Sequence, residues 1–89
     1  MMRKGWKKRM MKENDVFLTK DLYEASFLYA NRLKLLDLQK EDRFYWFVFE
    51  NKELAEELSK KYWQREAPID ASTYAEAIRS LKDRLYARK

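Results

Sequence analysis

A run of six consecutive apolar side chains at residues 44–49, five of them aromatic, constrains the fold of this chain more than any other feature. A strand with one face in water alternates apolar and polar residues with a period of two, and this run does not. As a strand it would direct Phe44, Trp46 and Val48 to one face and Tyr45, Phe47 and Phe49 to the other. Either protein covers both faces, or one face is an aromatic platform for a ligand.

Apolar periodicity and capping residues predict the element order β-α-β-β-α-α. The strands are expected at residues 16–18, 33–39 and 44–50, and a charged turn at 40–43 makes the last two a hairpin. The helices are expected to follow three residues of the capping type: Thr19, Asn51 and Asp70. They should end near residue 31, near residue 65 before Ala67-Pro68, and at the C-terminus.

This order predicts an α+β fold with a three-stranded sheet and three helices. A right-handed crossover makes the first two strands parallel and places the third between them, so the strand order is 1-3-2 and the aromatic strand is central. Leaving three aromatic side chains in water would forfeit several kcal/mol, at roughly 1.5–3 kcal/mol each. We therefore expect a three-layer arrangement, with the last helix over Tyr45, Phe47 and Phe49 and the first two helices over the opposite face.

Positive charge is concentrated at the N-terminus. The first twelve residues carry six basic side chains and no acidic one: Arg3, Lys4, Lys7, Lys8, Arg9 and Lys12. From Glu13 onward, fourteen basic residues face fifteen acidic ones, so the rest of the chain is nearly neutral. The composition predicts a basic, flexible arm at residues 1–14 and a single α+β domain at residues 15–89.

The sequence lacks the residues that several classes of functional site usually require. The chain has no cysteine and no histidine, which removes disulfides, thiolate chemistry, the commonest general base and the commonest transition-metal ligand. One glycine cannot form a phosphate-cradling loop. The longest apolar run, six residues, is far too short to span a membrane. We expect a cytoplasmic protein that is not an enzyme, with no cofactor, no metal, no small-molecule site and no membrane span.

The basic arm could have three different roles. Its lysines and arginines could bind the phosphates of DNA or RNA, with an affinity that falls steeply with salt. They could contact an anionic membrane surface with Trp6 at the interface, or the arm could be a solvated tail.

The sequence of the third strand also partly matches the signature of an RNA-recognition motif. Arg43, Tyr45, Phe47 and Val48 fit positions of the signature K/R-G-F/Y-G/A-F-V-x-F/Y, and Val16-Phe17-Leu18 fits the shorter motif on the first strand. Phe44 and Trp46 replace the small residues of that signature, and Glu50 replaces its last aromatic residue. On this reading Phe17, Tyr45 and Phe47 would stack bases; on the structural reading they lie under the last helix.

Four segments resemble a small bacterial family. They are Thr-Lys-Asp-Leu-Tyr-Glu-Ala-Ser-Phe-Leu-Tyr-Ala at 19–30, Phe-Tyr-Trp-Phe-Val-Phe-Glu at 44–50, Tyr-Trp at 62–63 and Leu-Lys-Asp-Arg-Leu at 81–85. The family is a domain of unknown function found in Gram-positive bacteria and their phages or mobile elements, and the resemblance covers about residues 16–88. It implies a compact α+β domain that serves DNA or RNA transactions of a mobile element.

Together these observations predict a non-enzymatic binding or accessory domain. The first hypothesis is association with nucleic acid through the basic arm. The alternative is a module that binds a protein partner or a second copy of itself, with no nucleic-acid role, because the nearly neutral body carries many large aromatic residues, among them Trp63 and Tyr86.

Overall fold

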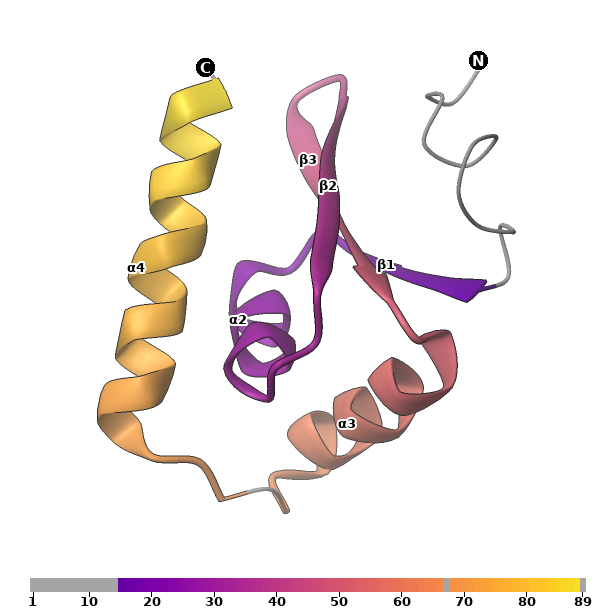
Figure 1. The fold of residues 1–89 in the computed structure, drawn as a ribbon, viewed down its shortest axis with the longest axis vertical. Helices are drawn as coiled ribbons and strands as arrows, with labels where there is room; N and C mark the ends of the chain where they lie inside the picture. The colour runs from indigo at the N-terminus through magenta and orange to yellow at the C-terminus, as the bar shows by residue number, and fades with distance from the viewer. Residues whose placement is uncertain (1–14, 67, 89) are drawn as a thin grey trace.

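The computed structural model describes residues 15–66 and 68–88. The order of elements in this part is β-α-β-β-α-α, as the sequence predicts (Figure 1). The elements are β1 (Val16–Thr19), α2 (Leu22–Ala30), β2 (Leu35–Glu41), β3 (Phe44–Glu50), α3 (Lys52–Gln64) and α4 (Ala71–Arg88).

The three strands form one sheet in the order β1-β3-β2, so the aromatic strand is central and the α+β prediction is confirmed. Both neighbours of β3 run antiparallel to it, which leaves β1 and β2 parallel to each other. The register pairs Leu18 with Val48 on one side of β3 and Gln39 with Trp46 on the other. A bulge interrupts β2 between Leu35 and Asp37.

The hairpin between β2 and β3 is tighter than predicted. Glu41 pairs with Phe44, so only Asp42 and Arg43 form the turn, where a four-residue turn was expected. Asp42 has a φ of 54°, in the left-handed region that two-residue hairpin turns require and that aspartate tolerates better than most residues.

All three helices pack on the same face of the sheet, and the predicted three-layer arrangement is wrong for the described chain. The main core joins residues of the sheet to residues of every helix: Phe17, Leu38, Tyr45, Phe47 and Phe49 from the strands, Ala25, Phe27 and Leu28 from α2, Ala55, Leu58 and Tyr62 from α3, and Tyr74, Leu81 and Leu85 from α4. In Figure 1, α2 and α4 lie on one side of β2 and β3. The last helix does cover Tyr45 and Phe47, as expected.

Helix α2 begins two residues later than predicted. Its N-cap is Asp21, whose carboxylate accepts hydrogen bonds from the backbone N–H groups of Tyr23 at 2.8 Å and Glu24 at 2.9 Å. Thr19, the predicted cap, is the last residue of β1, and its hydroxyl donates to the Glu24 carboxylate at 2.6 Å. Aspartate two residues nearer the helix is the better placed acceptor for the free amides of the first turn.

The caps of α3 and α4 are those that the sequence predicts. Asn51 accepts a hydrogen bond from the Leu54 N–H at 3.2 Å, and Asp70 accepts one from the Thr73 N–H at 2.9 Å. Helix α3 ends at Arg65, which has a φ of 61° and donates its own N–H to helix carbonyls, a common way for a helix to terminate.

The Asp70 cap predicts an acid-dependent loss of stability. The Thr73 N–H, with the hydroxyls of Ser72 and Thr73, lowers the pKa of Asp70 below its usual 3.8 because all three donate to the ionised form. A lowered folded-state pKa gives stability that is present above pH 3.8 and is lost as the pH falls through the folded value. The melting temperature of wild type should therefore exceed that of Asp70→Ala at pH 7, and the gap should narrow between pH 4 and pH 2. A gap of constant size down to pH 2 would contradict the role of the ionised cap.

Candidate functional site

The predicted nucleic-acid-binding residues lie outside the described part of the chain. Arg3, Lys4, Lys7, Lys8, Arg9 and Lys12 all precede Asp15, so the arm at residues 1–14 stays a prediction from sequence. The structure fixes where the arm joins the domain: Asp15 leads directly into β1, an edge strand of the sheet.

The three aromatic residues predicted to stack bases are in the core instead. Phe17, Tyr45 and Phe47 all belong to the helix-covered cluster, and Phe47 is only 2% exposed. The Tyr45 hydroxyl donates to the backbone oxygen of Arg88 at 3.3 Å, at the C-terminal end of α4. Because helices pack over these rings, this face is not an open platform for stacked bases, and the structural interpretation of the three residues holds.

The opposite face of the sheet, which we call the outer sheet face, carries the other half of the aromatic strand. Its residues are Val16 and Leu18 of β1, Phe44, Trp46, Val48 and Glu50 of β3, and Leu36, Gln39 and Glu41 of β2. Phe44 and Trp46 are partly exposed and meet edge to face, with ring centroids 5.4 Å apart.

Both of these rings have polar neighbours. The Lys20 ammonium lies 4.7 Å from the centroid of Phe44, and the Trp46 indole N–H donates to Glu41 at 3.3 Å. A cation over a ring and a satisfied indole hold the two aromatic residues in fixed positions near the hairpin end of the sheet.

A buried carboxylate links β1, α2 and α3. Glu24 is 6% exposed, and its oxygens accept hydrogen bonds from the Thr19 hydroxyl at 2.6 Å, the Trp63 indole N–H at 3.0 Å and the Ser59 hydroxyl. Because the donors come from β1 and α3, the carboxylate of Glu24 on α2 ties these three elements together. Sequence reasoning missed this cluster, since Glu24 stands in the first turn of a helix, where acidic residues usually face water.

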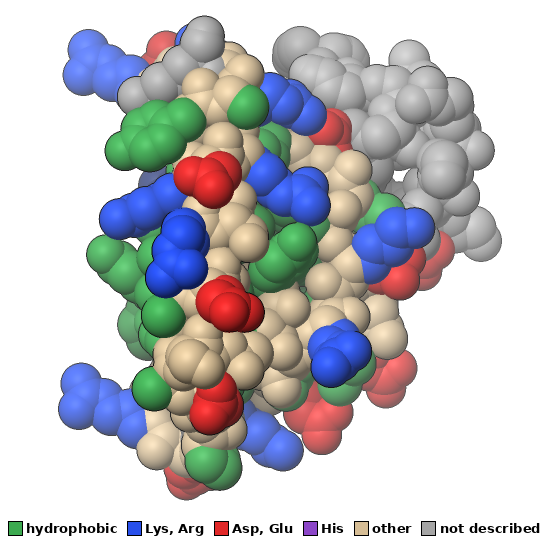
Figure 2. Space-filling model, turned by 60° about the vertical axis from the view of Figure 1, so that its left-hand side comes forward, with side chains coloured by type: hydrophobic (Ala, Val, Ile, Leu, Met, Phe, Trp, Pro, Cys, Tyr) green, Lys and Arg blue, Asp and Glu red, His purple; other side chains and the backbone are tan. Residues whose placement is uncertain are grey.

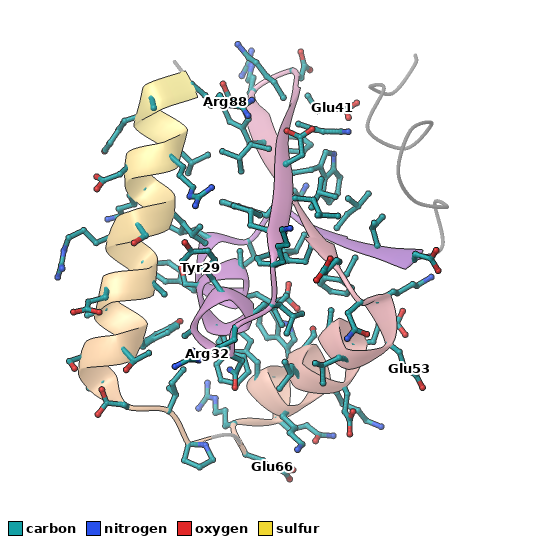
Figure 3. The ribbon with its side chains drawn as sticks, in the orientation of Figure 1. Tyr29, Arg32, Glu41, Glu53, Glu66 and Arg88 are labelled. Atoms are coloured by element: carbon teal, nitrogen blue, oxygen red, sulfur yellow. The ribbon has the colours of Figure 1, made fainter. Side chains whose placement is uncertain are left out.

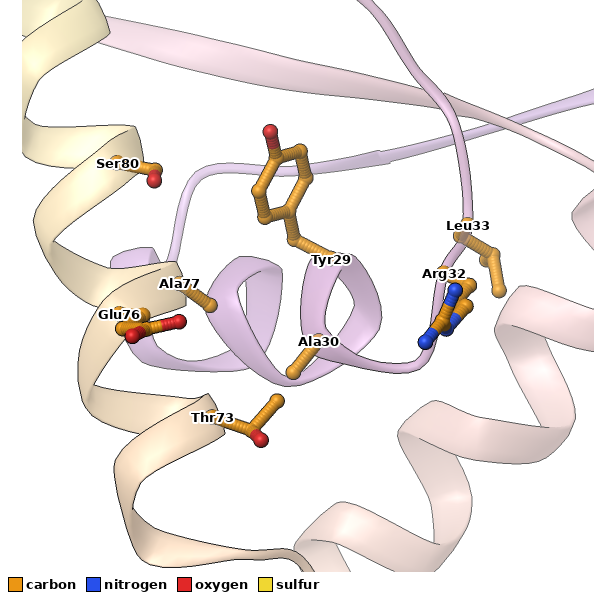
Figure 4. Close-up of a pocket in the computed structure, with 8 residues that line it drawn as sticks. All are labelled: Tyr29, Ala30, Arg32, Leu33, Thr73, Glu76, Ala77 and Ser80. Atoms are coloured by element: carbon orange, nitrogen blue, oxygen red, sulfur yellow. The ribbon is translucent and has the colours of Figure 1, made fainter.

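A groove of about 560 Å³ runs between α2 and α4. Figure 4 shows Tyr29, Ala30, Arg32 and Leu33 on the side of α2 and its following turn, and Thr73, Glu76, Ala77 and Ser80 on α4. The guanidinium of Arg84 lies 5.6 Å from the centroid of the Tyr29 ring and donates to its hydroxyl at 3.3 Å. One arginine and one glutamate face the groove, so its charges offset each other and favour no ion of either sign.

The C-terminal end of α4 is fastened to the edge of the sheet. Arg88 donates to the Leu38 carbonyl at 3.2 Å and lies 3.5 Å from the Asp37 carboxylate. Figure 3 shows Arg88 at the end of α4 nearest the hairpin. These contacts hold the end of α4 at the sheet edge, and the buried Ala77 and Leu81 make the helix part of the core.

Tyr74 is the described residue whose pKa is most clearly raised. Burial raises the pKa of Tyr74 to about 12, and the neighbouring Tyr62 adds to the effect. Its hydroxyl is therefore neutral at pH 7, where it donates to the Tyr23 carbonyl at 3.1 Å. This is a structural contact between α4 and α2, and it gives no activated base or nucleophile.

Residues 15–66 and 68–88 contain neither a candidate membrane span nor a candidate metal cluster. None of the helices there combines the length and apolar character needed to cross a bilayer. That same part brings together no group of three histidine, cysteine, aspartate or glutamate side chains suited to a metal ion.

A comparison with known proteins identifies the family of this chain. No curated protein and no solved structure matches the sequence. A family model described as a domain of unknown function, DUF5659, matches residues 14–87, which is almost the whole described structure and excludes all six basic residues of the arm. The chain therefore belongs to the DUF5659 family.

Proposed function

We propose that this protein is a non-enzymatic accessory domain that associates with DNA or RNA through the basic residues of its N-terminal arm. The observation that carries the proposal is the segregation of charge, with six basic and no acidic side chains in the first twelve residues. Clustered lysines and arginines bind a phosphate backbone by releasing its condensed counterions. Such binding is independent of sequence, so the proposal includes no readout of bases.

The rest of the surface supports placing this role in the arm. Figure 2 shows acidic and basic side chains interspersed over the face that α4 presents, with no single sign dominating that view. The near balance of fourteen basic and fifteen acidic residues from Glu13 onward agrees with it. Long-range attraction of a polyanion needs an excess of positive charge, and the arm is where that excess lies.

The absence of catalysis is also part of the proposal. The sequence has no histidine or cysteine, the buried Glu24 carboxylate is occupied by three donors, and Tyr74 is held neutral. A chain without cysteine suits a reducing compartment, so we place it in the cytoplasm. The resemblance described above suggests service to a bacterial mobile element.

Charge removal in the full-length protein tests the arm. Replacing Lys7, Lys8 and Arg9 together with glutamine should weaken binding to a DNA duplex and to a single-stranded RNA. Each lost phosphate contact lowers the log–log salt slope by about 0.9 for duplex DNA, so three should lower it by about 2–3. Fluorescence anisotropy between 50 and 200 mM salt measures both affinity and slope.

A matched variant controls for net charge. Lys60, Lys61 and Lys82 are exposed on α3 and α4, and replacing all three with glutamine removes the same charge from the body. This variant should bind as wild type does. Equal weakening by the two triple variants, or binding that does not respond to salt, would contradict a phosphate-binding arm.

One exposed residue favours the alternative, a protein-interaction module. Trp63 is 59% exposed, yet its indole is held by Glu24 and its ring packs edge to face on Tyr62 at 5.0 Å. A large aromatic side chain fixed in place while facing water is a typical interface anchor. Light scattering that finds a defined dimer, together with no nucleic-acid binding by wild type, would favour this alternative.

A further inference from the structure

Strand β2 forms one edge of the sheet. In the described part of the chain it pairs with β3 alone, since the strand order is β1-β3-β2. An edge strand carries a row of backbone N–H and C=O groups that point away from the sheet, and a strand of another molecule can pair with them. β2 has seven residues and β1 has four, so β2 offers the longer row. The groups on this edge therefore decide whether two sheets can join.

The register of the hairpin identifies the residues whose backbone groups point outward. Glu41 pairs with Phe44 and closes the two-residue turn, so these two residues exchange hydrogen bonds across the hairpin. Opposite residues of an antiparallel ladder alternate between hydrogen-bonded and non-hydrogen-bonded pairs. Leu38 and Lys40 therefore belong to non-hydrogen-bonded pairs, and their backbone N–H and C=O groups face the open edge of β2.

Charged side chains occupy both outward groups of Leu38. Its N–H donates to the Asp37 carboxylate at 2.8 Å, and its carbonyl accepts from the Arg88 guanidinium at 3.2 Å. A second nitrogen of that guanidinium lies 3.5 Å from the Asp37 carboxylate, so the two charged side chains are also paired with each other. An added strand would need the same two backbone groups, so it cannot pair with Leu38 while these side chains are in place.

The last turn of α4 holds Arg88 at this edge. The Tyr45 hydroxyl donates to the backbone oxygen of Arg88 at 3.3 Å, which fixes the end of the helix against β3. Figure 3 shows Arg88 beside the hairpin. The other outward residue of β2, Lys40, is an exposed lysine. Charged side chains on an edge strand are a common means by which sheets avoid edge-to-edge association.

We infer that Asp37 and Arg88 form an edge guard, a pair of side chains that prevents β2 from pairing with β2 of a second copy of this protein. Two copies of one strand can pair antiparallel about a two-fold axis. An axis at Gln39 would place Leu38 opposite Lys40 of the second copy, so the contact would need the backbone groups that the edge guard occupies. The inference concerns self-association and does not depend on nucleic-acid binding by the arm.

The full-length double variant Asp37→Ala/Arg88→Ala tests the edge guard. It frees both outward groups of Leu38, so its dimer dissociation constant should fall by about tenfold or more relative to wild type, the effect of one net backbone hydrogen bond per copy. Analytical ultracentrifugation over a range of concentrations measures the constant, and hydrogen exchange of the Leu38 amide should slow as the variant dimerises. The control, Lys52→Ala/Glu56→Ala, removes a surface ion pair on α3 and should associate as wild type does.

Two further substitutions locate the contact. Lys40→Pro removes an outward N–H and no ladder bond to β3, so adding it to the double variant should abolish the dimer. The conservative Asp37→Asn keeps an acceptor oxygen for the Leu38 N–H and leaves Arg88 on the carbonyl, so it should associate as wild type does.

Three results would overturn the inference. They are a wild-type protein that itself dimerises through β2, a folded double variant whose association and Leu38 amide exchange match those of wild type, and a dimer that survives Lys40→Pro. If circular dichroism shows that the double variant does not fold, Asp37→Ala alone decides, because it leaves Arg88 in place. Its Leu38 amide should then exchange faster than in wild type at low concentration, and equal rates would count against the edge guard.

Discussion

Replacing Phe47 with alanine is expected to lower the unfolding free energy by roughly 3–5 kcal/mol, the range for a fully buried aromatic side chain. Phe47 is central in the sheet and packs in the cluster that residues of all three helices complete. Since a small domain holds only about 5–15 kcal/mol in total, this variant should be close to the limit of folding. Urea denaturation followed by circular dichroism gives the free energy by linear extrapolation.

Trp46→Ala is the matched control in the same strand. Trp46 is the larger residue, but it is only partly buried and lies on the outer sheet face, so we expect a smaller loss than for Phe47→Ala. A larger loss at Trp46 would mean that the outer sheet face, and not the helix-covered one, holds most of the core. It would contradict the packing of the described elements.

The element order and the sheet topology could be predicted because they depend on local patterns and one handedness rule. The stripe of α4, whose buried members are Ala77 and Leu81, repeats at helical spacing, and Asp70 marks its start. The right-handed crossover then fixes β3 between β1 and β2. None of these steps requires knowledge of which face a helix covers.

The placement of the helices was wrong for a physical reason that α2 shows. Five consecutive residues of α2, from Glu24 to Leu28, are buried, so this helix is enclosed on several sides. A helix buried all round lies in the middle of a domain, with the sheet on one side and other helices around it. The apolar pattern of β3 indicates that helices cover the sheet, but it does not say which helix covers which face.

The carboxylate cluster could not be predicted because its partners are far apart in sequence. Ser59 and Trp63 reach Glu24 from a helix that begins almost thirty residues later, and no local pattern signals such contacts. The hydrogen bond from Thr19 to Glu24 also depends on which residue caps α2. Once Asp21 takes the N–H groups of the first turn, the Thr19 hydroxyl is available to Glu24.

Glu24→Ala should have the second large effect, a loss of roughly 2–4 kcal/mol in unfolding free energy. The substitution removes an acceptor for three donors and leaves the Thr19 hydroxyl, which is 6% exposed, without its carboxylate partner. Hydrogen bonds to a charged group contribute more than neutral ones, about 1.5–3 kcal/mol each, and water can replace part of the loss at the exposed Trp63. Urea denaturation measures the change.

Two further variants separate the hydrogen bonds from the charge. Glu24→Gln keeps one acceptor oxygen and turns the other into a donor, so it should lose about half as much as Glu24→Ala. Glu57→Gln, at an exposed position on α3, should stay within about 0.5 kcal/mol of wild type. In Glu24→Ala the Trp63 indole N–H resonance should also move, because it loses its acceptor. An unchanged Trp63 resonance and wild-type stability in Glu24→Ala would show that the carboxylate does not hold α3 against β1 and α2.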